Sequence, residues 1–266
     1  MGKDLLKNKK LFLFDMDGTI YLDGVLFDGT LELMNKIKEK NGNYVFITNN
    51  SSHSLDYYVK KISSYNIDVT EDNFYTSTLA TIDYLKTNYP NKKVFCLGNK
   101  SLIKELKDGK INVTTRYCKN VDVVLIGYDT ELNYKKLINI SKILTVKKDI
   151  PYIATHPDYV CPVDFGFVPD CGSMVKMIEY AVNRTPIYIG KPEPTMVKFA
   201  MKKFKTKNEE TVVIGDRLYT DIASGINAKV DTVCVLSGET SKKDIDMSDS
   251  KPTFVMQDVK EILNNI

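Results

Sequence analysis

Histidine is scarce in this chain, and its cysteines do not form the close pairs that bind metals. Only His53 and His156 are present among 266 residues. A histidine-rich zinc site is therefore excluded, and a His-based catalytic triad would have to use one of these two. The five cysteines are odd in number and include no Cys-x-x-Cys pair, which predicts free thiols in a reducing cytoplasm.

Long apolar runs and basic clusters are also missing. No run approaches the ~18 apolar residues of a membrane-spanning helix, and the charged first ten residues lack the apolar stretch of a secretory signal. Lysine and arginine number 37 against 34 acidic residues and are scattered, whereas a nucleic-acid-binding face needs clustered charge. We therefore expect a cytoplasmic protein without membrane or nucleic-acid partners, whose carboxylates supply its chemistry.

Short apolar runs alternate with longer amphipathic stretches along the chain. This alternation predicts βαβ units and an α/β fold with a Rossmann-like parallel sheet. The predicted strands are 11–14, 44–47, 94–97, 122–127, 152–154, 187–190, 211–215 and 232–236. The predicted helices are 30–40, 54–65, 78–88, 133–147, 173–182, 194–204, 220–228 and 257–265. The polar segment 237–252 is predicted to be a surface loop.

The first motif places two acids directly after an apolar strand. Asp15 and Asp17 follow the run 11–14 and precede Gly18 and Thr19. Ligands bind at the carboxyl ends of strands in open α/β sheets, and neighbouring acids repel each other unless a cation compensates them. Oxygen ligands suit Mg²⁺, although Asp and Gly are also ordinary turn residues.

The second motif is a polar cluster at the end of strand 44–47. Its residues are Thr48, Asn49, Asn50, Ser51 and Ser52. Hydroxyl, amide and backbone N–H groups before a helix can cradle a phosphate. The same residue types also form ordinary helix N-caps, so both interpretations stay open.

The third motif is a lysine with a restrained backbone. Lys191 follows strand 187–190 and lies between Gly190 and Pro192. A lone lysine after a strand is usually a solvated surface residue. The flanking residues favour a positioned cation, which could screen Asp15 and hold a phosphoryl oxygen.

The fourth motif adds two further acids. Asp216 follows strand 211–215, and an acid at a buried strand end needs a partner. Asp221 comes where the predicted helix 220–228 begins. It either caps that helix or completes a carboxylate cluster around the cation of the first motif.

Together these strand ends predict covalent phosphoryl chemistry. A carboxylate can attack phosphorus and form an aspartyl-phosphate, while Mg²⁺ neutralises the two anions that must meet. A second Asp can protonate the leaving alkoxide and then activate water. Lys191 and Thr48 would hold the transferring oxygens.

In this order, the motifs DMDGT, ITNN, GKPEP and GDRLYTD resemble those of the haloacid dehalogenase (HAD) superfamily of aspartate-nucleophile phosphohydrolases. Their spelling is most similar to the class IIA branch, which includes NagD-type and p-nitrophenyl phosphatases. The resemblance covers about residues 9–260. It implies that Asp15 is the nucleophile and Asp17 the general acid/base.

The resemblance also implies the ligands of a metal and of the phosphate. Mg²⁺ would be held by the Asp15 carboxylate, the Asp17 backbone carbonyl and Asp216. Asp221 would support the site from outside this ligand set. The implied phosphate binders are Thr48, the backbone of Asn49, and Lys191.

The domain layout follows from the resemblance as well. Far more residues separate Thr48 from Lys191 than one βα unit needs, and this gap resembles an inserted α/β cap of the C2 type. We predict a catalytic core at 1–78 and 184–266 with the cap at 79–183. The loop 154–174 resembles the substrate-facing loop of the branch, but its prolines and glycines fit a structural turn equally well. Its candidates for leaving-group contacts are His156, Asp158 and Asp170, and no catalytic role is assigned to His156.

These features predict a Mg²⁺-dependent phosphatase of small phosphorylated metabolites, such as nucleotides or sugar phosphates, with p-nitrophenyl phosphate as an artificial substrate. A homodimer through the cap is implied by the resemblance alone. A phosphomutase is disfavoured, because too few residues separate Asp15 from Thr48 to hold the cap that such enzymes commonly insert there. The alternative is a non-catalytic or regulatory phosphometabolite-binding protein on the same fold, against which the intact acid set argues.

Overall fold

The computed structural model describes residues 6–50, 54–163 and 165–266, which divide into two compact units. Unit 1 takes in the chain up to Thr48, then Leu55–Tyr75 and Lys191–Ile266. Unit 2 takes in Asn49–Ser54 and Thr76–Gly190. The predicted insertion at 79–183 lies inside unit 2, which also includes 184–190 because strand β12 (Ile187–Tyr188) pairs with β9 (Tyr152–Ala154) of that unit.

Unit 1 is built on a six-stranded sheet with the order β15-β14-β13-β1-β4-β5. β1 pairs in parallel with β4 and β13, and β14 pairs in parallel with β13 and β15. Strand β1, which precedes the first motif, is buried throughout, as expected for a parallel strand covered on both faces. The strands are β1 (Leu11–Phe14), β4 (Asn43–Thr48), β5 (Phe74–Thr76), β13 (Thr211–Gly215), β14 (Asp231–Val235) and β15 (Phe254–Met256).

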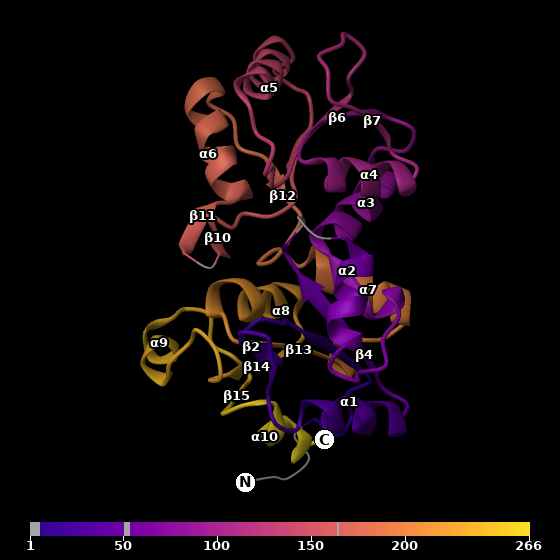
Figure 1. Cartoon of the computed structure of the whole chain (residues 1–266), viewed down its shortest axis with the longest axis vertical. Coiled ribbons are helices and arrows are strands. Elements are labelled where there is room, and N and C mark those ends of the chain that lie inside the picture. Colours follow the sequence, from indigo (N-terminus) through magenta and orange to yellow (C-terminus); the bar gives the residue numbers. More distant parts are fainter. Residues whose placement is uncertain (1–5, 51–53, 164) are drawn as a thin grey trace. The chain divides into compact units, whose positions relative to one another are not determined.

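Helices cover both faces of this sheet (Figure 1). α1 packs against α10, and α7 packs against α8 and also against β1 and β4. The helices are α1 (Thr30–Glu39), α2 (Leu55–Ser63), α7 (Thr195–Phe204), α8 (Ala223–Ala228), α9 (Lys242–Met247) and α10 (Val259–Leu263). A small antiparallel pair, β2 (Tyr21–Leu22) and β3 (Val25–Leu26), follows the first motif. A π-helical turn, Leu218–Ile222, precedes α8, and single 3₁₀ turns lie at Glu71–Asn73 and Asn208–Glu210.

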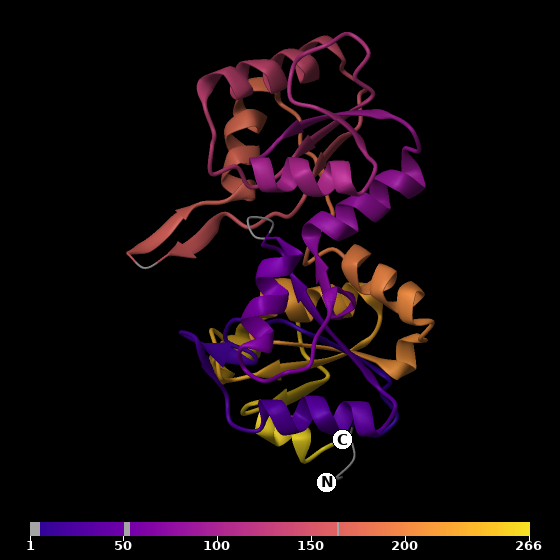
Figure 2. The same ribbon diagram turned by 45° about the vertical axis from the view of Figure 1, so that its right-hand side comes forward.

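Unit 2 contains a parallel sheet of its own, with the order β12-β9-β8-β6-β7. Its remaining strands are β6 (Lys93–Leu97), β7 (Asn112–Thr114) and β8 (Val123–Ile126). Its helices are α3 (Ser77–Asn88), α4 (Lys100–Asp108), α5 (Tyr134–Val146) and α6 (Cys171–Val182). An antiparallel hairpin, β10 (Val160–Val163) and β11 (Gly166–Pro169), stands away from this sheet in Figure 2.

Each unit has a separate hydrophobic core. In unit 1 the core includes a row of aromatic contacts that runs from Phe12 and Phe14 through Phe46 to Phe74. In unit 2 the buried strands β8 and β9 pack with α5 and α6 through residues such as Ile143. Two cores of this kind fit two α/β layers that bury their own apolar faces. No helix in the described ranges is both long and apolar enough to cross a membrane.

The eight predicted strands all occur in the two sheets. The segment 237–252 lies largely at the surface, as predicted, but it is not a loop throughout, because it contains helix α9 (Lys242–Met247). Its residues 237–240 also contact the first and fourth motifs. Helix α4 was not predicted, since only Leu102 and Leu106 of its residues are buried and its apolar stripe is therefore narrow.

Candidate active site

Three adjacent strands of unit 1 deliver the first, second and fourth motifs to one edge of the sheet. Phe14 at the end of β1 pairs with Ile214 of β13 on one side and with Phe46 of β4 on the other. Asp15 therefore leaves the sheet beside Asp216 and Thr48, and its N–H still donates to the carbonyl of Ile214 at 2.8 Å. This is the carboxyl edge, where parallel α/β sheets bind ligands.

Lys191 joins two of the acids in the interior of this edge. Its Nζ donates to Oδ1 of Asp15 and to Oδ1 of Asp221, each at 2.6 Å, and to the carbonyl of Ile47 at 3.3 Å. The lysine is 3% exposed. Burial by itself lowers the pKa of the Lys191 ammonium, but the charges of Asp15 and Asp221 raise it overall. Lys191 is therefore a fixed cation at any physiological pH, and the solvated alternative does not hold.

Asp216 is held by donors from two loops. The hydroxyl of Thr19 donates to its Oδ1 at 3.2 Å, and the backbone N–H of Glu239 donates to its Oδ2 at 2.8 Å. Space around this carboxylate is so tight that a Cβ on Gly18 would lie 2.6 Å from Oδ2, and one on Gly238 would lie 2.1 Å from it. Gly18 also has a φ of +82°, a conformation that glycine adopts most readily.

Asp221 lies in the π-helical turn Leu218–Ile222 rather than at an N-cap. One carboxylate oxygen accepts from Lys191, and the other accepts from the backbone N–H of Arg217 at 3.1 Å. Burial raises the pKa of Asp221, Lys191 opposes this, and Asp15 adds to it. Both oxygens are thus engaged by the protein, which fits a supporting position better than direct metal binding.

The acids of this edge suit a divalent cation. Asp15, Asp216 and Asp221 can each place one carboxylate oxygen within 4.8 Å of the others. Burial and the charge of Asp15 raise the pKa of Asp216, so its ionised form lacks compensation from the protein alone. Arg217 faces the same acids, and although burial lowers its pKa, their charges raise it overall. An all-oxygen donor set with excess negative charge matches Mg²⁺.

Asp17 has a different environment from that of Asp15. It is exposed to solvent, and the hydroxyl of Tyr21 donates to its Oδ2 at 3.1 Å. Lys61 of α2 in turn donates to the Tyr21 hydroxyl at 2.9 Å and lies 4.1 Å from the centre of that ring. Partial loss of hydration raises the pKa of Asp17, and the Lys61 charge opposes this. The two acids of the first motif are thus held by separate partners.

The second motif is divided by the boundary between the units. Thr48 ends β4 in unit 1, while Asn49 belongs to unit 2. Both residues are buried, and the side chain of Asn49 donates to Asp158 at 3.0 and 3.2 Å. Ser51 and Ser52 lie outside the described residues. Thr48 and the backbone of Asn49 stay predicted phosphate binders.

The three candidates of loop 154–174 form a cluster within unit 2. His156 is fully buried, with Nδ1 3.6 Å from Asp158 and Nε2 3.6 Å from Asp170. Asp170 is the N-cap of α6, where its Oδ1 accepts from the N–H of Cys171 at 2.5 Å. Burial raises the pKa of Asp170, and His156 opposes this. Their contacts with a leaving group stay a prediction.

We call Asp15, Asp216 and Asp221 the acid cluster. Sequence reasoning missed several residues that contact this cluster or the loops around it. Arg217 and Glu239 form an ion pair at 3.0 Å, and the hydroxyl of Ser237 donates to the carbonyl of Gly18 at 2.8 Å. The dipeptide Ser237-Gly238 follows the predicted strand 232–236 and so marks another strand end at the same edge. That position was the available signal, because ligands gather where parallel strands end.

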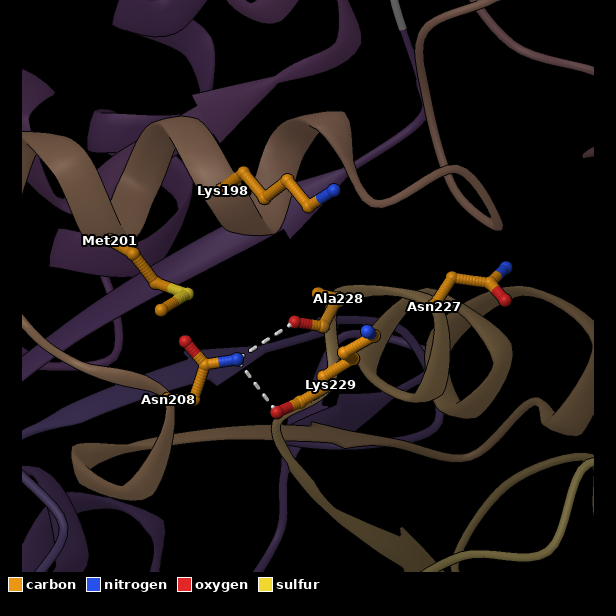
Figure 3. A pocket seen from close by; sticks show the side chains of 6 residues that line it. All are labelled: Lys198, Met201, Asn208, Asn227, Ala228 and Lys229. Atoms are coloured by element: carbon orange, nitrogen blue, oxygen red, sulfur yellow. Dashed lines mark hydrogen bonds between the residues drawn. The ribbon is translucent and has the colours of Figure 1, made fainter.

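A separate hollow of about 280 Å³ lies in unit 1, beside α7 and α8 (Figure 3). The Asn208 amide donates to the carbonyls of Ala228 and Lys229 at 3.2 and 2.9 Å and closes the end of α8. Lys198 extends over the hollow from α7. The hollow shares no lining residue with the acid cluster, and we assign the hollow no part in the chemistry.

Comparisons with known proteins agree with this geometry. Residues 12–112 match the family model described as haloacid dehalogenase-like hydrolase, and residues 188–262 match a second model described as HAD-hydrolase-like. A 4-nitrophenylphosphatase from Thermotoga maritima is 38% identical, with a TM-score of 0.90 and 97% of each chain covered. NagD from E. coli K-12 is 32% identical, with a TM-score of 0.86 over 95% of this chain and 98% of that one.

Curated sequences give the same family. The acid sugar phosphatase of Staphylococcus haemolyticus is 31% identical over 98% of this chain and 98% of its own length. That of Staphylococcus aureus (strain MRSA252) is 30% identical over 97% of this chain and 98% of its own length. The ordered motifs, the two α/β units and these full-length likenesses agree. The chain belongs to the haloacid dehalogenase-like hydrolases, in the branch of the NagD-type and p-nitrophenyl phosphatases.

Proposed function

We propose that this protein is a Mg²⁺-dependent phosphatase that hydrolyses small phosphomonoesters through an aspartyl-phosphate on Asp15. The observation that carries the proposal is the buried Lys191, which pairs with Asp15 and Asp221 beside Asp216 at the carboxyl edge of one sheet. Burying this many charges is costly. Binding of a phosphoryl group and a divalent cation at this site would explain why the charges are gathered here.

Asp15 is the nucleophile in this proposal. Its Oδ1 is held by Lys191, which leaves the other oxygen to attack phosphorus. A bond forms between that oxygen and phosphorus while the bond from phosphorus to the ester oxygen breaks. The leaving alkoxide takes a proton from Asp17. The ion pair with Lys191 fixes the direction of attack, because rotation of the Asp15 carboxylate would break a 2.6 Å contact.

Asp17 acts in both halves of the reaction. After its proton has gone to the leaving group, the carboxylate can take one from a water molecule. That water attacks phosphorus, the bond to Asp15 breaks, and inorganic phosphate and the free carboxylate are regenerated. Tyr21 orients Asp17 from the side away from this exchange, since its hydroxyl donates to Oδ2 of Asp17, and Lys61 holds Tyr21 by donating to the same hydroxyl.

The phosphoryl oxygens need donors and positive charge. We assign them to the hydroxyl of Thr48, the backbone N–H of Asn49 and the ammonium of Lys191. The Asp15 and Asp216 carboxylates and the Asp17 backbone carbonyl would hold Mg²⁺. When bound, the ion neutralises phosphoryl charge so that the substrate and the Asp15 carboxylate can meet.

Sugar phosphates are the first substrates to test. The curated relatives are named acid sugar phosphatases and one of the similar structures is named a 4-nitrophenylphosphatase, so p-nitrophenyl phosphate is the matching artificial substrate. We propose that unit 2 is the cap that selects the leaving group. The homodimer stays a prediction, which a measurement of the mass in solution can test. The five free cysteines support a reducing, cytoplasmic location.

Replacing the nucleophile tests the proposal. Asp15→Asn keeps the size of the side chain but removes its nucleophilic oxygen charge, and p-nitrophenyl phosphate turnover with Mg²⁺ should fall at least about 10³-fold. Unchanged turnover would rule out Asp15 as the nucleophile. If the wild-type protein binds sugar phosphates but turns none of them over, the alternative of a non-catalytic phosphometabolite-binding protein takes its place.

A further inference from the structure

The chain passes between the units at four peptide links, and two of these links adjoin a proposed phosphate binder. Thr48 is followed by Asn49, and Gly190 is followed by Lys191. We propose that His156 is a positioning residue that, through Asp158, fastens the unit 2 ends of these two links to each other. The inference rests on the proposed function, since its consequence is the placement of Thr48 and Lys191 for phosphate.

The first link is fixed at Asn49 from two directions. Its side-chain amide donates to both carboxylate oxygens of Asp158 at 3.0 and 3.2 Å. Its backbone carbonyl accepts from the hydroxyl of Ser77, the buried first residue of α3, at 2.6 Å. The plane of the peptide that leads on to Asn50 therefore depends on where Asp158 and α3 lie.

The second link is fixed at Gly190. Its N–H donates to the carbonyl of Thr155 at 2.7 Å. A Cβ at this position would lie 2.4 Å from Oδ1 of Asn49 and 2.9 Å from Cβ of His156. Asn49 and Gly190 are thus in direct contact inside unit 2, and His156 packs against the glycine. A displacement of either link is passed to the other because the packing leaves no free space.

His156 connects these links to the rest of unit 2. Its ring is fully buried between Asp158 on the Nδ1 side and Asp170 on the Nε2 side, each at 3.6 Å. Neither nitrogen has a hydrogen-bond partner within the described residues, and 3.6 Å is beyond good hydrogen-bond length. The ring is therefore held by packing between the two carboxylates. Asp170 is anchored at the start of α6, and Asp158, on the other side of the ring, binds Asn49. The Asp158 side of the ring thus carries the connection to the first link.

These three side chains could also be read as a metal site, because each can place a ligand atom within 4.8 Å of the others. The geometry favours positioning instead. The carboxylates face opposite nitrogens of the ring, whereas a metal ion takes one nitrogen of an imidazole and leaves the other to a hydrogen bond. One of the two carboxylates would then face the ring nitrogen that the metal ion does not take.

Two amide substitutions separate the two sides of the ring. His156→Asn keeps a donor near the Nδ1 position, toward Asp158, and His156→Gln keeps one near the Nε2 position, toward Asp170. We expect His156→Asn to stay within about twofold of the wild type in KM for p-nitrophenyl phosphate and in Ki for inorganic phosphate. His156→Gln should raise both about fivefold or more with kcat changed less, as for other supporting contacts.

Two further variants complete the test. Asp158→Asn cuts the same connection from its other end, so it should weaken phosphate binding, and its effect should not add to that of His156→Gln. Tyr152→Phe removes another buried polar atom without a partner in the described part of unit 2, on β9. It should change thermal stability alone, and so serves as the matched control.

Hydrogen exchange gives a readout that does not depend on turnover. The Gly190 amide should exchange at least about fivefold faster in His156→Gln than in His156→Asn, because its bond to Thr155 loosens. Equal kinetics and equal exchange in the two variants would overturn the inference. So would a stoichiometric metal ion that is present in the wild type and absent from both variants. A wild type without turnover would refute the proposed function but leave the exchange comparison as the test of the linkage.

Discussion

The ammonium of Lys191 lies 2.6 Å from Oδ1 of Asp15, although 176 residues separate them along the chain. The lysine is covalently the first residue of unit 1 after the excursion through unit 2. Its position is therefore set at once by an ion pair in the acid cluster and by the link that precedes it. This pairing gives the buried carboxylates a cation that belongs to the protein.

Removing that cation should damage stability and activity together. In Lys191→Met the half-buried Asp15 and the buried Asp221 lose their partner, and the free energy of unfolding should fall by about 3 kcal/mol. The value of kcat/KM for p-nitrophenyl phosphate should fall about 10²–10³-fold. Denaturant unfolding and steady-state kinetics measure the two effects.

Lys9→Met is the matched control for this substitution. Lys9 also belongs to unit 1, and its side chain is 5% exposed and pairs with Asp231 at 2.5 Å, outside the acid cluster. We expect it to lose stability but to keep kcat. If Lys9→Met reduced kcat as strongly as Lys191→Met does, the loss of activity in Lys191→Met would be explained by lost stability and not by a catalytic role of Lys191.

Gly18 offers a test of how closely the first loop approaches Asp216. In Gly18→Ala the new Cβ would lie 2.6 Å from Oδ2 of Asp216 and must displace it. The Mg²⁺ concentration for half-maximal activity should therefore rise about tenfold or more. Gly24 has a similar backbone, with φ of +78°, but no atom within 4 Å of its Cβ position.

Gly24→Ala therefore isolates the cost of the backbone conformation. Gly24→Ala should lose about 1 kcal/mol of stability, because a residue with a Cβ is strained at positive φ. Gly18→Ala should lose more, because the clash with Asp216 adds to this strain. Only Gly18→Ala should shift the Mg²⁺ titration. Identical titrations for the two variants would show that the contact with Asp216 does not govern the metal.

The strand ends of the acid cluster could be read from the sequence because each acid follows an apolar run. Residues that follow parallel strands lie at the same edge of the sheet, and this does not depend on the path of the loops. Asp15, Asp216 and Lys191 accordingly meet, as the motifs predicted. The proposed roles of these residues as nucleophile, metal ligand and phosphate binder come from the resemblance to the HAD family, and the geometry supports them.

Contacts that depend on loop paths could not be predicted in this way. Glu239 reaches Asp216 through a backbone N–H, which leaves no trace in residue type. Helix α9 had a signal that we missed, because Ser241 and Asp244 form a reciprocal capping box at its start. The dominance of charged residues in that segment obscured the helix.

A last prediction concerns a contribution to the pH dependence of stability that arises outside the acid cluster. Glu105 of α4 is partly buried, and its Oε1 has no hydrogen-bond partner among the described residues. Burial raises the pKa of this carboxyl to about 7, against an ordinary value of 4.5, with Lys104 opposing and Asp108 adding to the shift. The folded protein thus keeps a proton that the unfolded chain releases.

Between about pH 4.5 and about pH 7 the folded state binds more protons than the unfolded state. Glu105 should therefore lower the free energy of unfolding as pH rises through this window. The whole shift corresponds to about 3 kcal/mol, and partial exposure of the carboxyl to solvent reduces the expected fall to about 2 kcal/mol. Glu105→Gln is neutral at every pH, so it should match the wild type at pH 5 and exceed it by that amount at pH 8. Urea unfolding at both pH values measures the difference. The exposed Glu131→Gln of the same unit should follow the wild type, and a Glu105→Gln profile parallel to the wild type would contradict the assignment.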